Sequence, residues 1–489
     1  MNIYSSFLRS FEAFKPIKDK KVVMYVCGLT PYDYVHIGHT RTYIAFDIIK
    51  RYLIKKGYKV FHIQNITDVE DKIIKRSKET GISPTKLVST HHDEALELFN
   101  KLNIIRADVY PKVTENIKEI ISLIKKLLEK KYAYETKTGI YFQVSKFSDY
   151  GELSNQKLDE IKSGARIEID ETKKSPEDFA LWKKTKDEII EFDSPFGRGR
   201  PGWHIECSAM AEKYAKNTLD IHGGARDLIF PHHENEIAQS EAALNKKFCN
   251  YWLHTGFLTV NGEKMSKSLG NFIKLKDVVS KFSLNAIRLF FIQAHYRSPI
   301  DYNEEQLQVA EENAERIFNT LGLMLESSKN KNSKIDKDFR SATEEKLKEF
   351  YQKLDNDFNT PEALATFFDL LRIINSNTSG KTIDISHVKM LIEELEKILW
   401  IFGLKEDKKD IDKKLNEIDE VQEWLHKTFN YMFKEKKNPE KILDEIILFR
   451  DSLRLEKKYK ESDLVRDKLK AVGIILEDKE KGKRWKLID

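Results

Sequence analysis

The stretch Lys21-Val-Val-Met-Tyr-Val-Cys27 is a short β-branched and apolar run that predicts a buried strand. Gly28 and Pro31 end the run, and residues 40–55 then carry apolar side chains at helical spacing. A second strand is predicted over Lys59–Gln64. A strand, a helix and a strand at this spacing predict a βαβ unit with a parallel sheet and a right-handed crossover. Ligands of such sheets bind at the carboxyl ends of the strands, so the loop after the first strand is the first candidate for a functional site.

The composition is that of a globular chain with several domains. At roughly 100–200 residues per domain, 489 residues predict about three domains. Hydrophobic residues make up 40% and charged residues 33%, which excludes a disordered or collagen-like chain. The net charge of +5 neither demands nor excludes a nucleic-acid partner. No apolar run approaches the roughly 18 residues of a membrane span, and the first residues lack a signal-peptide core, so we expect a cytoplasmic protein with no membrane partner.

The middle of the chain reads as an insertion within the first fold. A helix is predicted over residues 116–134 and a strand over 139–144, and residues 153–191 are charged and irregular. Strand-like, glycine-rich pieces resume at residues 199–224. The first fold therefore continues after about 80 residues of inserted chain.

The last third of the chain is mainly helical. Residues 304–402 have an almost purely helical pattern with one proline, Pro361, and predict a helix bundle. From Lys405 onward the chain is charged and helical, and it ends in short strand-like pieces such as Gly473-Ile-Ile-Leu. We find no internal repeat and no low-complexity tract.

The tetrapeptide His36-Ile-Gly-His39 lies at the predicted start of the first helix. Helix N-termini bind anions through free backbone N–H groups, and two imidazoles there add donors for a phosphate. Gly38 has no side chain, so a flat ring can approach the backbone. Two surface histidines beside a helix start would give the same letters, and the motif alone leaves both interpretations open.

A second phosphate-seeking candidate is Lys264-Met-Ser-Lys-Ser268. It offers two lysines, Lys264 and Lys267, and two hydroxyls in a loop bounded by Gly262 and Gly270. In a chain with 84 basic residues, a solvated surface loop is the alternative.

Four side chains form a candidate metal set, namely Cys27, Cys207, His232 and Glu236. His232 and Glu236 are four residues apart on a helix predicted to open at Pro231, so they share one face. Two thiolates, an imidazole and a carboxylate suit a tetrahedral zinc ion. The sequence lacks the closely spaced pair of cysteines that is typical of many zinc sites, and inert buried thiols are the alternative.

The third cysteine, Cys249, has no clustered partners, and we assign it no function. Three widely separated cysteines also argue against a disulfide framework.

A further candidate is His222-Gly-Gly-Ala-Arg-Asp227, which follows an apolar stretch. Gly224 permits a close backbone approach, and Asp227 can accept a hydrogen bond from a ribose hydroxyl. A turn with an incidental aspartate is the alternative.

Together these motifs resemble the class I aminoacyl-tRNA synthetases and, within them, the cysteinyl-tRNA synthetase family. The resemblance runs nearly end to end. It is carried by the following segments: Met24-Tyr-Val-Cys-Gly28, Val35-His-Ile-Gly-His39, Asp178-Phe-Ala-Leu-Trp-Lys183, Gly199-Arg-Pro-Gly-Trp-His-Ile-Glu-Cys-Ser-Ala-Met210, Phe230-Pro-His-His-Glu-Asn-Glu236, Lys264-Met-Ser-Lys-Ser268, Asp357-Phe-Asn-Thr-Pro-Glu-Ala-Leu364 and Gly473-Ile-Ile-Leu-Glu-Asp478.

The resemblance implies an α/β Rossmann-type catalytic domain with a connective insertion, then a helix bundle and a small C-terminal anticodon-binding domain. The implied boundaries are the first half of the catalytic domain at 1–115, the connective insertion at 116–199, the second half at 200–260, the KMSKS loop and stem-contact segment at 261–303, the helix bundle at 304–404 and the anticodon-binding domain at 405–489.

The resemblance also implies roles for individual residues. The family's single zinc ion would be held by Cys27, Cys207, His232 and Glu236. The substrate cysteine would lie among Gly28, Thr30, Thr67, Trp203 and His222. ATP would meet His36, Gly38, His39, Gly224, Asp227 and Lys267, and the catalytic groups would be His36, His39, Lys264 and Lys267.

The implied reaction joins L-cysteine to tRNA(Cys) through a cysteinyl-adenylate made from ATP and Mg²⁺, and we expect a monomer. Zinc would favour the softer, more acidic thiol over the hydroxyl of serine, so no editing domain is expected. Aromatic and basic residues at Lys483-Arg-Trp485 could stack on anticodon bases, although a fraying terminus is the alternative.

The chain departs from the family at three places. It has Gly28-Leu-Thr-Pro-Tyr-Asp33 where the family commonly has Gly-Pro-Thr-Val-Tyr-Asp, Ala225 in place of a third glycine, and Gly482-Lys-Arg-Trp485 in place of Gly-Thr-x-Trp. The second departure bears on the fit of adenosine and the third on single anticodon contacts.

Two rival functions stay open from the residues alone. A related ligase could pass activated cysteine to an amino sugar, but such a small acceptor needs no C-terminal reader after Lys405. A non-catalytic RNA-binding relative could keep the fold, but it would not need both phosphate motifs.

Overall fold

The computed structural model describes residues 1–157, 171–186, 188–265, 270–328, 336–378, 384–406, 418–434, 439–472, 474–476 and 485–487. Its contacts divide the chain into two compact units. The first unit holds residues 1–315, 338–373 and 397–404, and the second holds 316–337, 374–396 and 405–489.

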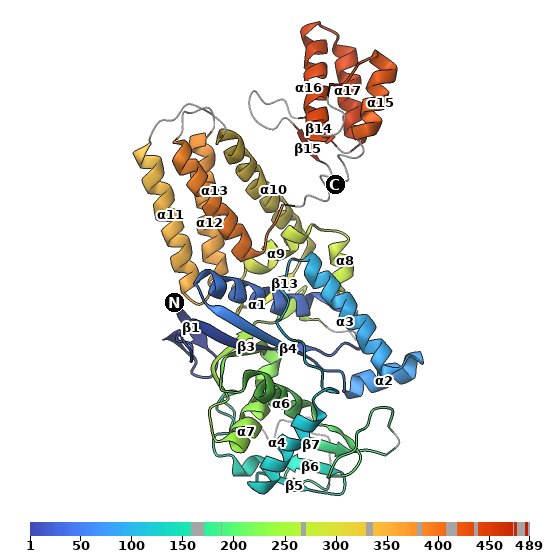
Figure 1. Ribbon diagram of the computed structural model, residues 1–489, viewed down its shortest axis with the longest axis vertical. Helices are drawn as coiled ribbons and strands as arrows, with labels where there is room; N and C mark the ends of the chain where they lie inside the picture. Colours follow the sequence, from blue (N-terminus) through green and yellow to red (C-terminus); the bar gives the residue numbers. More distant parts are fainter. Residues whose placement is uncertain are drawn as a thin grey trace. The chain divides into compact units, whose positions relative to one another are not determined.

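A parallel sheet forms the centre of the first unit (Figure 1). Its strands, in spatial order, are β10 (Cys249–Thr255), β9 (Leu219–Ala225), β3 (Lys21–Leu29) and β4 (Lys59–Ile66). Single parallel bridges from β4 to Val109 and Lys112 continue the sheet beyond its edge. The segment at residues 109–112 and the four strands are numbered 1 to 5 in the order in which they occur along the chain. Read across the sheet from residues 109–112 to β10, their order is 3-2-1-4-5, which is the Rossmann order.

The predicted βαβ unit is confirmed. β3 is buried from Met24 to Cys27, as expected for a strand that is covered on both faces. The helix α1 (Ile37–Lys55) follows it and crosses over to β4. α1 lies on one face of the sheet, and α6 (Trp203–Ala215) packs on the other face against β3 and β4 (Figure 1).

The second half of the Rossmann fold differs from the sequence-based expectation in two details. The glycine-rich region expected to be strand-like holds β8 (Gly199–Pro201) and β9, but also the helix α6. Pro231 does not open a helix: it lies in a π-helical turn (Ile229–His233), and α7 (Glu234–Leu244) begins three residues later. Phe230 is extended because a residue before proline avoids the helical region.

The insertion carries its own antiparallel sheet. α4 (Ile117–Glu129) is shorter than predicted, and the residues after it form β5 (Ala133–Glu135) instead. The sheet order is β5-β6-β7-β8, with β6 at Gly139–Phe142 and β7 at Phe179–Lys184. β7 lies within the segment expected to be irregular, so that expectation was wrong for its last part.

The remaining elements of the catalytic part flank the central sheet. They are β1 (Asn2–Ser5), β2 (Ser10–Ala13), α2 (Asp71–Thr80), α3 (Pro84–Lys101), β11 (Leu258–Val260), β12 (Glu263–Lys264), α8 (Leu275–Val279), α9 (Leu284–Ile292) and β13 (Ile300–Tyr302). No helix among the described residues is long and apolar enough to cross a bilayer.

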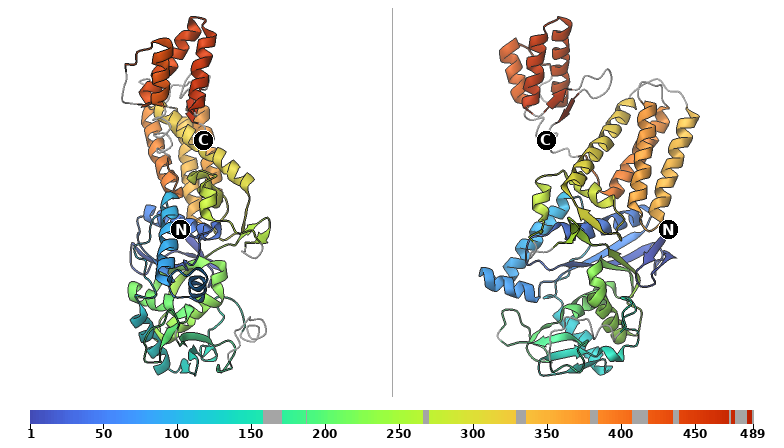
Figure 2. Two further views of the ribbon diagram at one scale, coloured as in Figure 1. Left: turned by 90° about the vertical axis from the view of Figure 1, so that its right-hand side faces the viewer. Right: turned by 180° about the vertical axis from the view of Figure 1, so that it is seen from behind.

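The predicted helical region consists of four long helices (Figure 2). They are α10 (Glu304–Ser327), α11 (Lys337–Asp355), α12 (Thr360–Thr378) and α13 (Ile385–Phe402). Pro361 is the second residue of α12, in the first turn, where a missing backbone N–H costs no helical hydrogen bond. α10, α12 and α13 each run through both units.

The C-terminal residues form a small separate core. Its elements are α15 (Ile418–Phe429), α16 (Pro439–Leu455), α17 (Tyr459–Ala471) and the antiparallel pair β14 (Ile474–Leu476) and β15 (Trp485–Leu487). Apolar side chains such as Leu425, Leu443 and Val465 fill this core. Gly473, the acidic end of the Gly473–Asp478 motif, and Lys483 and Arg484 lie outside the described residues.

Candidate functional site

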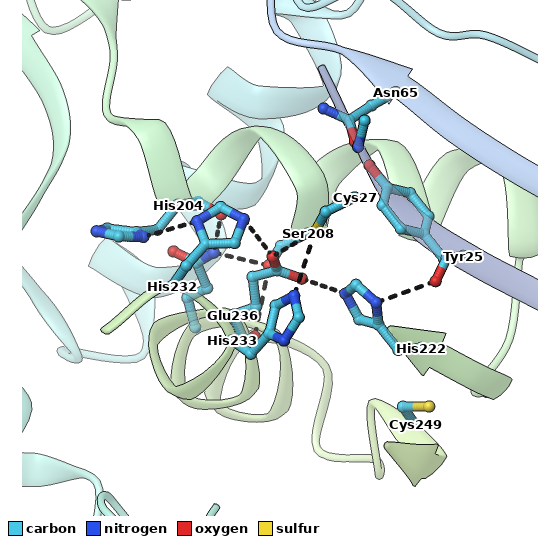
Figure 3. Close-up of polar contacts among 12 residues, drawn as sticks. Tyr25, Cys27, Asn65, His204, Ser208, His222, His232, His233, Glu236 and Cys249 are labelled. Atoms are coloured by element: carbon cyan, nitrogen blue, oxygen red, sulfur yellow. Dashed lines mark hydrogen bonds and ion pairs between the residues drawn. The ribbon is translucent and has the colours of Figure 1, made fainter. Parts of the chain in front are cut away.

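The structure brings the four candidate metal ligands together at the carboxyl end of β3 (Figure 3 labels Cys27, His232 and Glu236). Cys27 is near the end of β3, Cys207 is on α6, His232 is in the π-helical turn and Glu236 is in the first turn of α7. Their ligand atoms lie within 4.8 Å of one another, and all four side chains are buried. Residues separated by up to about 200 positions therefore form one cluster.

Glu236 is the centre of the cluster. Its Oε1 lies 2.7 Å from Nε2 of His232, and its Oε2 lies 2.6 Å from Nε2 of His222. Burial alone would raise the pKa of Glu236, but the charges and hydrogen bonds of His222 and His232 lower it to about 2. Glu236 is therefore a carboxylate at neutral pH.

The two thiols have different acidities. The hydrogen bond from Cys27 lowers the pKa of Cys207 to about 6 against the effect of burial, with help from His232. Burial and the neighbouring Cys207 and Glu236 raise the pKa of Cys27 well above its ordinary value. Burial opposes charge on His232 too, yet Glu236 and Cys207 raise its pKa to about 10. One thiolate and one carboxylate thus face a cationic imidazole.

The donor set fits zinc. Zinc bonds of roughly 2.0–2.3 Å to nitrogen, oxygen and sulfur need four donors that surround a point, and two thiols with an imidazole and a carboxylate supply them. A second group with the same spread, Cys27, His222, His233 and Glu236, shares two of these residues. It has one thiol instead of two, and the softer thiolate is a ligand that zinc prefers. The set with Cys207 and His232 therefore suits zinc better.

Cys249 stays outside the cluster, as its sequence context predicted (Figure 3). It is buried, and its Sγ lies 3.3 Å from the carbonyl oxygen of Tyr251, to which it donates.

Two of the residues expected around the amino acid, Gly28 and Thr67, are linked through a third residue, Asn65. Gly28 cannot carry a side chain, because a Cβ there would lie 1.5 Å from the carbonyl oxygen of Asn65. The Gly28 amide donates to Oδ1 of Asn65 at 2.9 Å, and Nδ2 of Asn65 donates to Oγ1 of Thr67 at 3.1 Å. Asn65, which the sequence analysis missed, thus fixes Gly28 and Thr67 relative to each other. Thr30 is half-buried in the loop after β3.

Trp203 and His222 bound the cluster on two sides. The ring of Trp203 stacks on His232 with centroids 4.4 Å apart. Trp203 is 40% exposed and lines a cavity of about 670 Å³ beside the inserted sheet. His222 is fully buried and stacks on Trp252.

The two predicted phosphate motifs meet at the start of α1. The rings of His36 and His39 stack with centroids 3.5 Å apart. The Ile37 amide donates to the carbonyl of Ile273 at 3.1 Å, and the Leu275 amide donates to that of Val35 at 2.9 Å. The backbone at residues 273–275, which follows the KMSKS motif (Lys264–Ser268), is therefore hydrogen-bonded to the backbone at residues 35–37, where the HIGH motif (His36–His39) begins. Residues 266–269, including Lys267, lie outside the described residues, and only the backbone of Lys264 is described, in β12.

The second histidine of the HIGH motif (His36–His39) is neutral at physiological pH. The surrounding protein and the positive charges of His36 and Lys72 lower the pKa of His39 well below its ordinary value. A neutral ring can donate through one nitrogen without carrying a fixed charge.

The residues predicted to meet adenosine lie on either side of the end of β9. A Cβ at Gly224 would lie 2.7 Å from Cδ1 of Leu228 and 3.6 Å from Cβ of Cys27, so the backbone is closely packed there. Ala225 follows in an extended conformation, and Asp227 is exposed in the next turn.

Three histidines around the cluster were missed by sequence reasoning: the buried His233 and His254 and the half-buried His204. Nδ1 of His204 lies 3.1 Å from Nδ1 of His232. His233 adjoins a predicted ligand in the sequence, and only this adjacency could have drawn attention to it. His204 likewise follows the predicted site residue Trp203 and lies three residues before Cys207, whereas His254 has no predicted site residue beside it.

Comparison with known families agrees with this geometry. Residues 13–312 match the family described as the tRNA synthetases class I (C) catalytic domain, and residues 349–406 match the DALR domain. The first match spans nearly all of the predicted catalytic domain with its insertion. The second match falls almost wholly in the predicted helix bundle.

The solved structures similar to this one have the same fold. The methionyl-tRNA synthetase of Mycobacterium tuberculosis, solved with methionyl-adenylate, has a TM-score of 0.60 at 16% identity and covers 78% of this chain and 89% of its own. The leucyl enzyme of Agrobacterium radiobacter, solved in a ternary complex, has a TM-score of 0.62 at 11% identity and covers 80% and 85%.

The sequence relatives are much nearer. The cysteine–tRNA ligase of Pyrococcus abyssi is 47% identical over all of this chain and 99% of its own length. That of Thermococcus gammatolerans is 46% identical over the same shares of the two chains. A likeness of this degree leaves no part of the chain unaccounted for, and the chain therefore belongs to the cysteine–tRNA ligase family of class I aminoacyl-tRNA synthetases.

Proposed function

We propose that this protein activates L-cysteine with MgATP and transfers the cysteinyl group to the 3′ end of tRNA(Cys), with one zinc ion held by Cys27, Cys207, His232 and Glu236. The observation that carries the proposal is the buried cluster of these four ligands at the carboxyl end of β3, a few residues before the HIGH motif. Membership of the family supplies the reaction, and the cluster supplies a means of choosing cysteine.

The first step forms an anhydride. A carboxylate oxygen of cysteine attacks the α-phosphorus of ATP, and pyrophosphate leaves with its electron pair. His36, Gly38 and His39 hold the triphosphate at the start of α1, while Gly224 and Asp227 face the nucleoside. Lys264 and Lys267 balance the negative charge that grows on the leaving pyrophosphate.

The second step moves the cysteinyl group to RNA. A ribose hydroxyl of the 3′-terminal nucleotide attacks the carbonyl carbon of the adenylate, and AMP leaves. Gly28, Thr30, Thr67, Trp203 and His222 keep the amino acid in place through both steps, because positioning supplies much of the rate in such reactions.

Discrimination against serine follows from the donor set. Bound zinc supplies a Lewis acid that favours a thiolate over a hydroxyl of the same size. A pocket of shape alone separates such isosteres poorly. The fully buried His222 and the Trp203 ring on His232 restrict the space around the cluster, so the substrate side chain has to approach the ligands.

The proposed enzyme acts as a monomer in the cytoplasm, where tRNA and ATP are found. All of the proposed site residues come from one chain, so the reaction needs no second copy. The separate core after Lys405 is available to contact the anticodon.

The decisive experiment is cysteine-dependent exchange of pyrophosphate into ATP, run beside charging of total tRNA and a zinc determination. We expect exchange with cysteine but not serine, charging of tRNA(Cys) alone, and about one zinc per chain. Competition between tRNA and amino sugars as acceptors excludes the rival ligase. Exchange with no tRNA charging, or an active protein without zinc, would overturn the corresponding part of the proposal.

A further inference from the structure

Two buried histidines, His233 and His254, are linked to Cys27 by successive polar contacts (Figure 3 shows His233). Nε2 of His233 lies 3.2 Å from Sγ of Cys27, and Nδ1 of the same ring lies 2.8 Å from Nε2 of His254. His233 is 0% exposed and His254 is 4% exposed. The three side chains form a chain of hydrogen bonds that is closed to water and ends on a candidate metal ligand.

The direction of these hydrogen bonds follows from the sulfur. A metal-bound thiolate has no hydrogen and can only accept, so the ring of His233 has to donate through Nε2. Nδ1 of His233 is then an acceptor, and His254 has to donate to it through Nε2. Nδ1 of His254 carries no hydrogen in this arrangement, which agrees with the absence of a hydrogen-bond partner for that atom among the described residues.

The net negative charge of the zinc-loaded cluster explains why a hydrogen-bond donor to Cys27 would stabilise it. Two thiolates and a carboxylate carry three negative charges against two positive charges on zinc. An N–H group directed at sulfur offsets part of this excess in a site that water does not reach. It also restrains the side chain of Cys27 in the orientation that binding requires.

We propose that His233 is a positioning residue of the metal centre, which donates to the Cys27 thiolate through Nε2, and that His254 fixes the ring of His233 in that tautomer. This inference rests on the zinc site of the proposed function and assigns the pair no direct contact with metal or substrate. The alternative is that His233 is itself a ligand, since it belongs to the second group with the right spread.

The test measures zinc affinity of the full-length protein by competition with a chromogenic chelator. His233→Leu removes the donor, and we expect zinc to bind about 10–100-fold more weakly, as for other partners of metal ligands. His233→Gln puts an amide N–H near the place of Nε2 and should restore most of that affinity. His62→Leu is the matched control, because His62 is a buried histidine of the same sheet whose ring nitrogens have no hydrogen-bond partner in the part of the chain that the structure describes.

His254 is tested through a double-mutant cycle. His254→Leu should weaken zinc binding in the same direction. The double variant His233→Leu/His254→Leu should bind no more weakly than His233→Leu alone, because His254 acts only through His233. Additive losses of zinc affinity would show that the two residues act independently and would overturn the inference that His254 acts through His233.

Cobalt substitution separates a positioning role from ligation. With both thiolates still bound, the His233→Leu protein should keep the thiolate-to-cobalt absorption of the wild type. A collapsed cobalt spectrum, together with a His233→Gln protein as defective as His233→Leu, would identify His233 as a ligand and overturn the inference. Wild-type affinity in His233→Leu would overturn it as well. A wild-type protein that binds no zinc would instead refute the proposed function, and this result appears before any variant is made.

Discussion

Met265 contacts the backbone of Gly38: its Cε lies 3.2 Å from the point that a Cβ at residue 38 would occupy. The same Cβ would lie 3.0 Å from Nδ1 of His36. The glycine of one phosphate motif is thus enclosed by a histidine of its own motif and the methionine of the other. This arrangement gives the first prediction.

Gly38→Ala should slow adenylate formation by about tenfold to a hundredfold, because the methyl group displaces the His36 ring or Met265 by a few tenths of an ångström from their working positions. Thermal stability should not fall, since alanine is a better helix former than glycine. Pyrophosphate exchange and a melting curve measure the two effects. Gly322→Ala is the control, because the added Cβ meets no described atom within 4 Å outside its own helix, and exchange should be unchanged. Normal exchange by Gly38→Ala would show that the enclosure has no role.

Cys207→Ser should lose zinc and cysteine-dependent exchange, because a hydroxyl does not replace a thiolate as a ligand. The loss of affinity should exceed the roughly 10–100-fold effect of removing a partner of a ligand. Elemental analysis and exchange measure both effects. Cys249→Ser provides a matched buried control, since that thiol lies outside the ligand cluster and donates to the carbonyl groups of Asp220 and Tyr251, and it should keep zinc and activity.

Lys267→Ala should slow adenylate formation by about 10²–10³-fold and leave the KM for cysteine nearly unchanged. The expectation comes from the sequence, since a cation that meets charge developing on pyrophosphate acts on the transition state more than on the bound substrate. Pre-steady-state adenylate formation measures the step. A rate within about twofold of the wild type would make Lys267 a solvated surface lysine.

A protein that ends at Leu404 should form cysteinyl-adenylate but charge tRNA poorly. The core of the C-terminal residues is built from positions 418–474, so its removal opens no part of the catalytic core. Exchange and charging are measured on the same preparation. Equal loss of both in a folded truncation would contradict the assignment of tRNA contacts to this region.

Buried His62 should contribute to loss of stability in acid. Burial, reinforced by the charge of Lys50, lowers the pKa of His62 to about 3. The unfolded chain takes up this proton near pH 6.5, so between about pH 6.5 and 3 the unfolded state binds more protons and stability falls as pH falls, by up to about 1.4 kcal/mol per pH unit. His62→Leu should reduce this slope by one proton. Denaturant unfolding at several pH values measures it, and an unchanged slope would show that the proton is taken up elsewhere.

The first βαβ unit could be predicted because its pattern is local. β3 is a continuous apolar run, and α1 carries apolar residues at helical spacing directly after a loop. α6 was missed because residues Ile205–Ala211 are all buried, so no alternation of polar and apolar faces marks it as a helix.

The candidate ligands could be named from the family resemblance, but their surroundings could not. Asn65 and His254 contact Gly28 and His233, which lie 37 and 21 residues away in the sequence, and no sequence pattern marks such contacts. The requirement for glycine at position 28 could not be predicted either, because only the fold shows that a Cβ there would clash with the carbonyl oxygen of Asn65.

Because the four clustered side chains are far apart in the sequence, they are synthesised at different times. Cys27 emerges from the ribosome early, whereas Glu236, on α7, follows 209 residues later (236 − 27). At translation rates of roughly 5–20 residues per second, this leaves the first thiol without its partners for about 10–40 s. During that interval a nascent chain offers an unshielded cysteine to oxidants and to other metals, so loading with the correct ion is a late event of biogenesis.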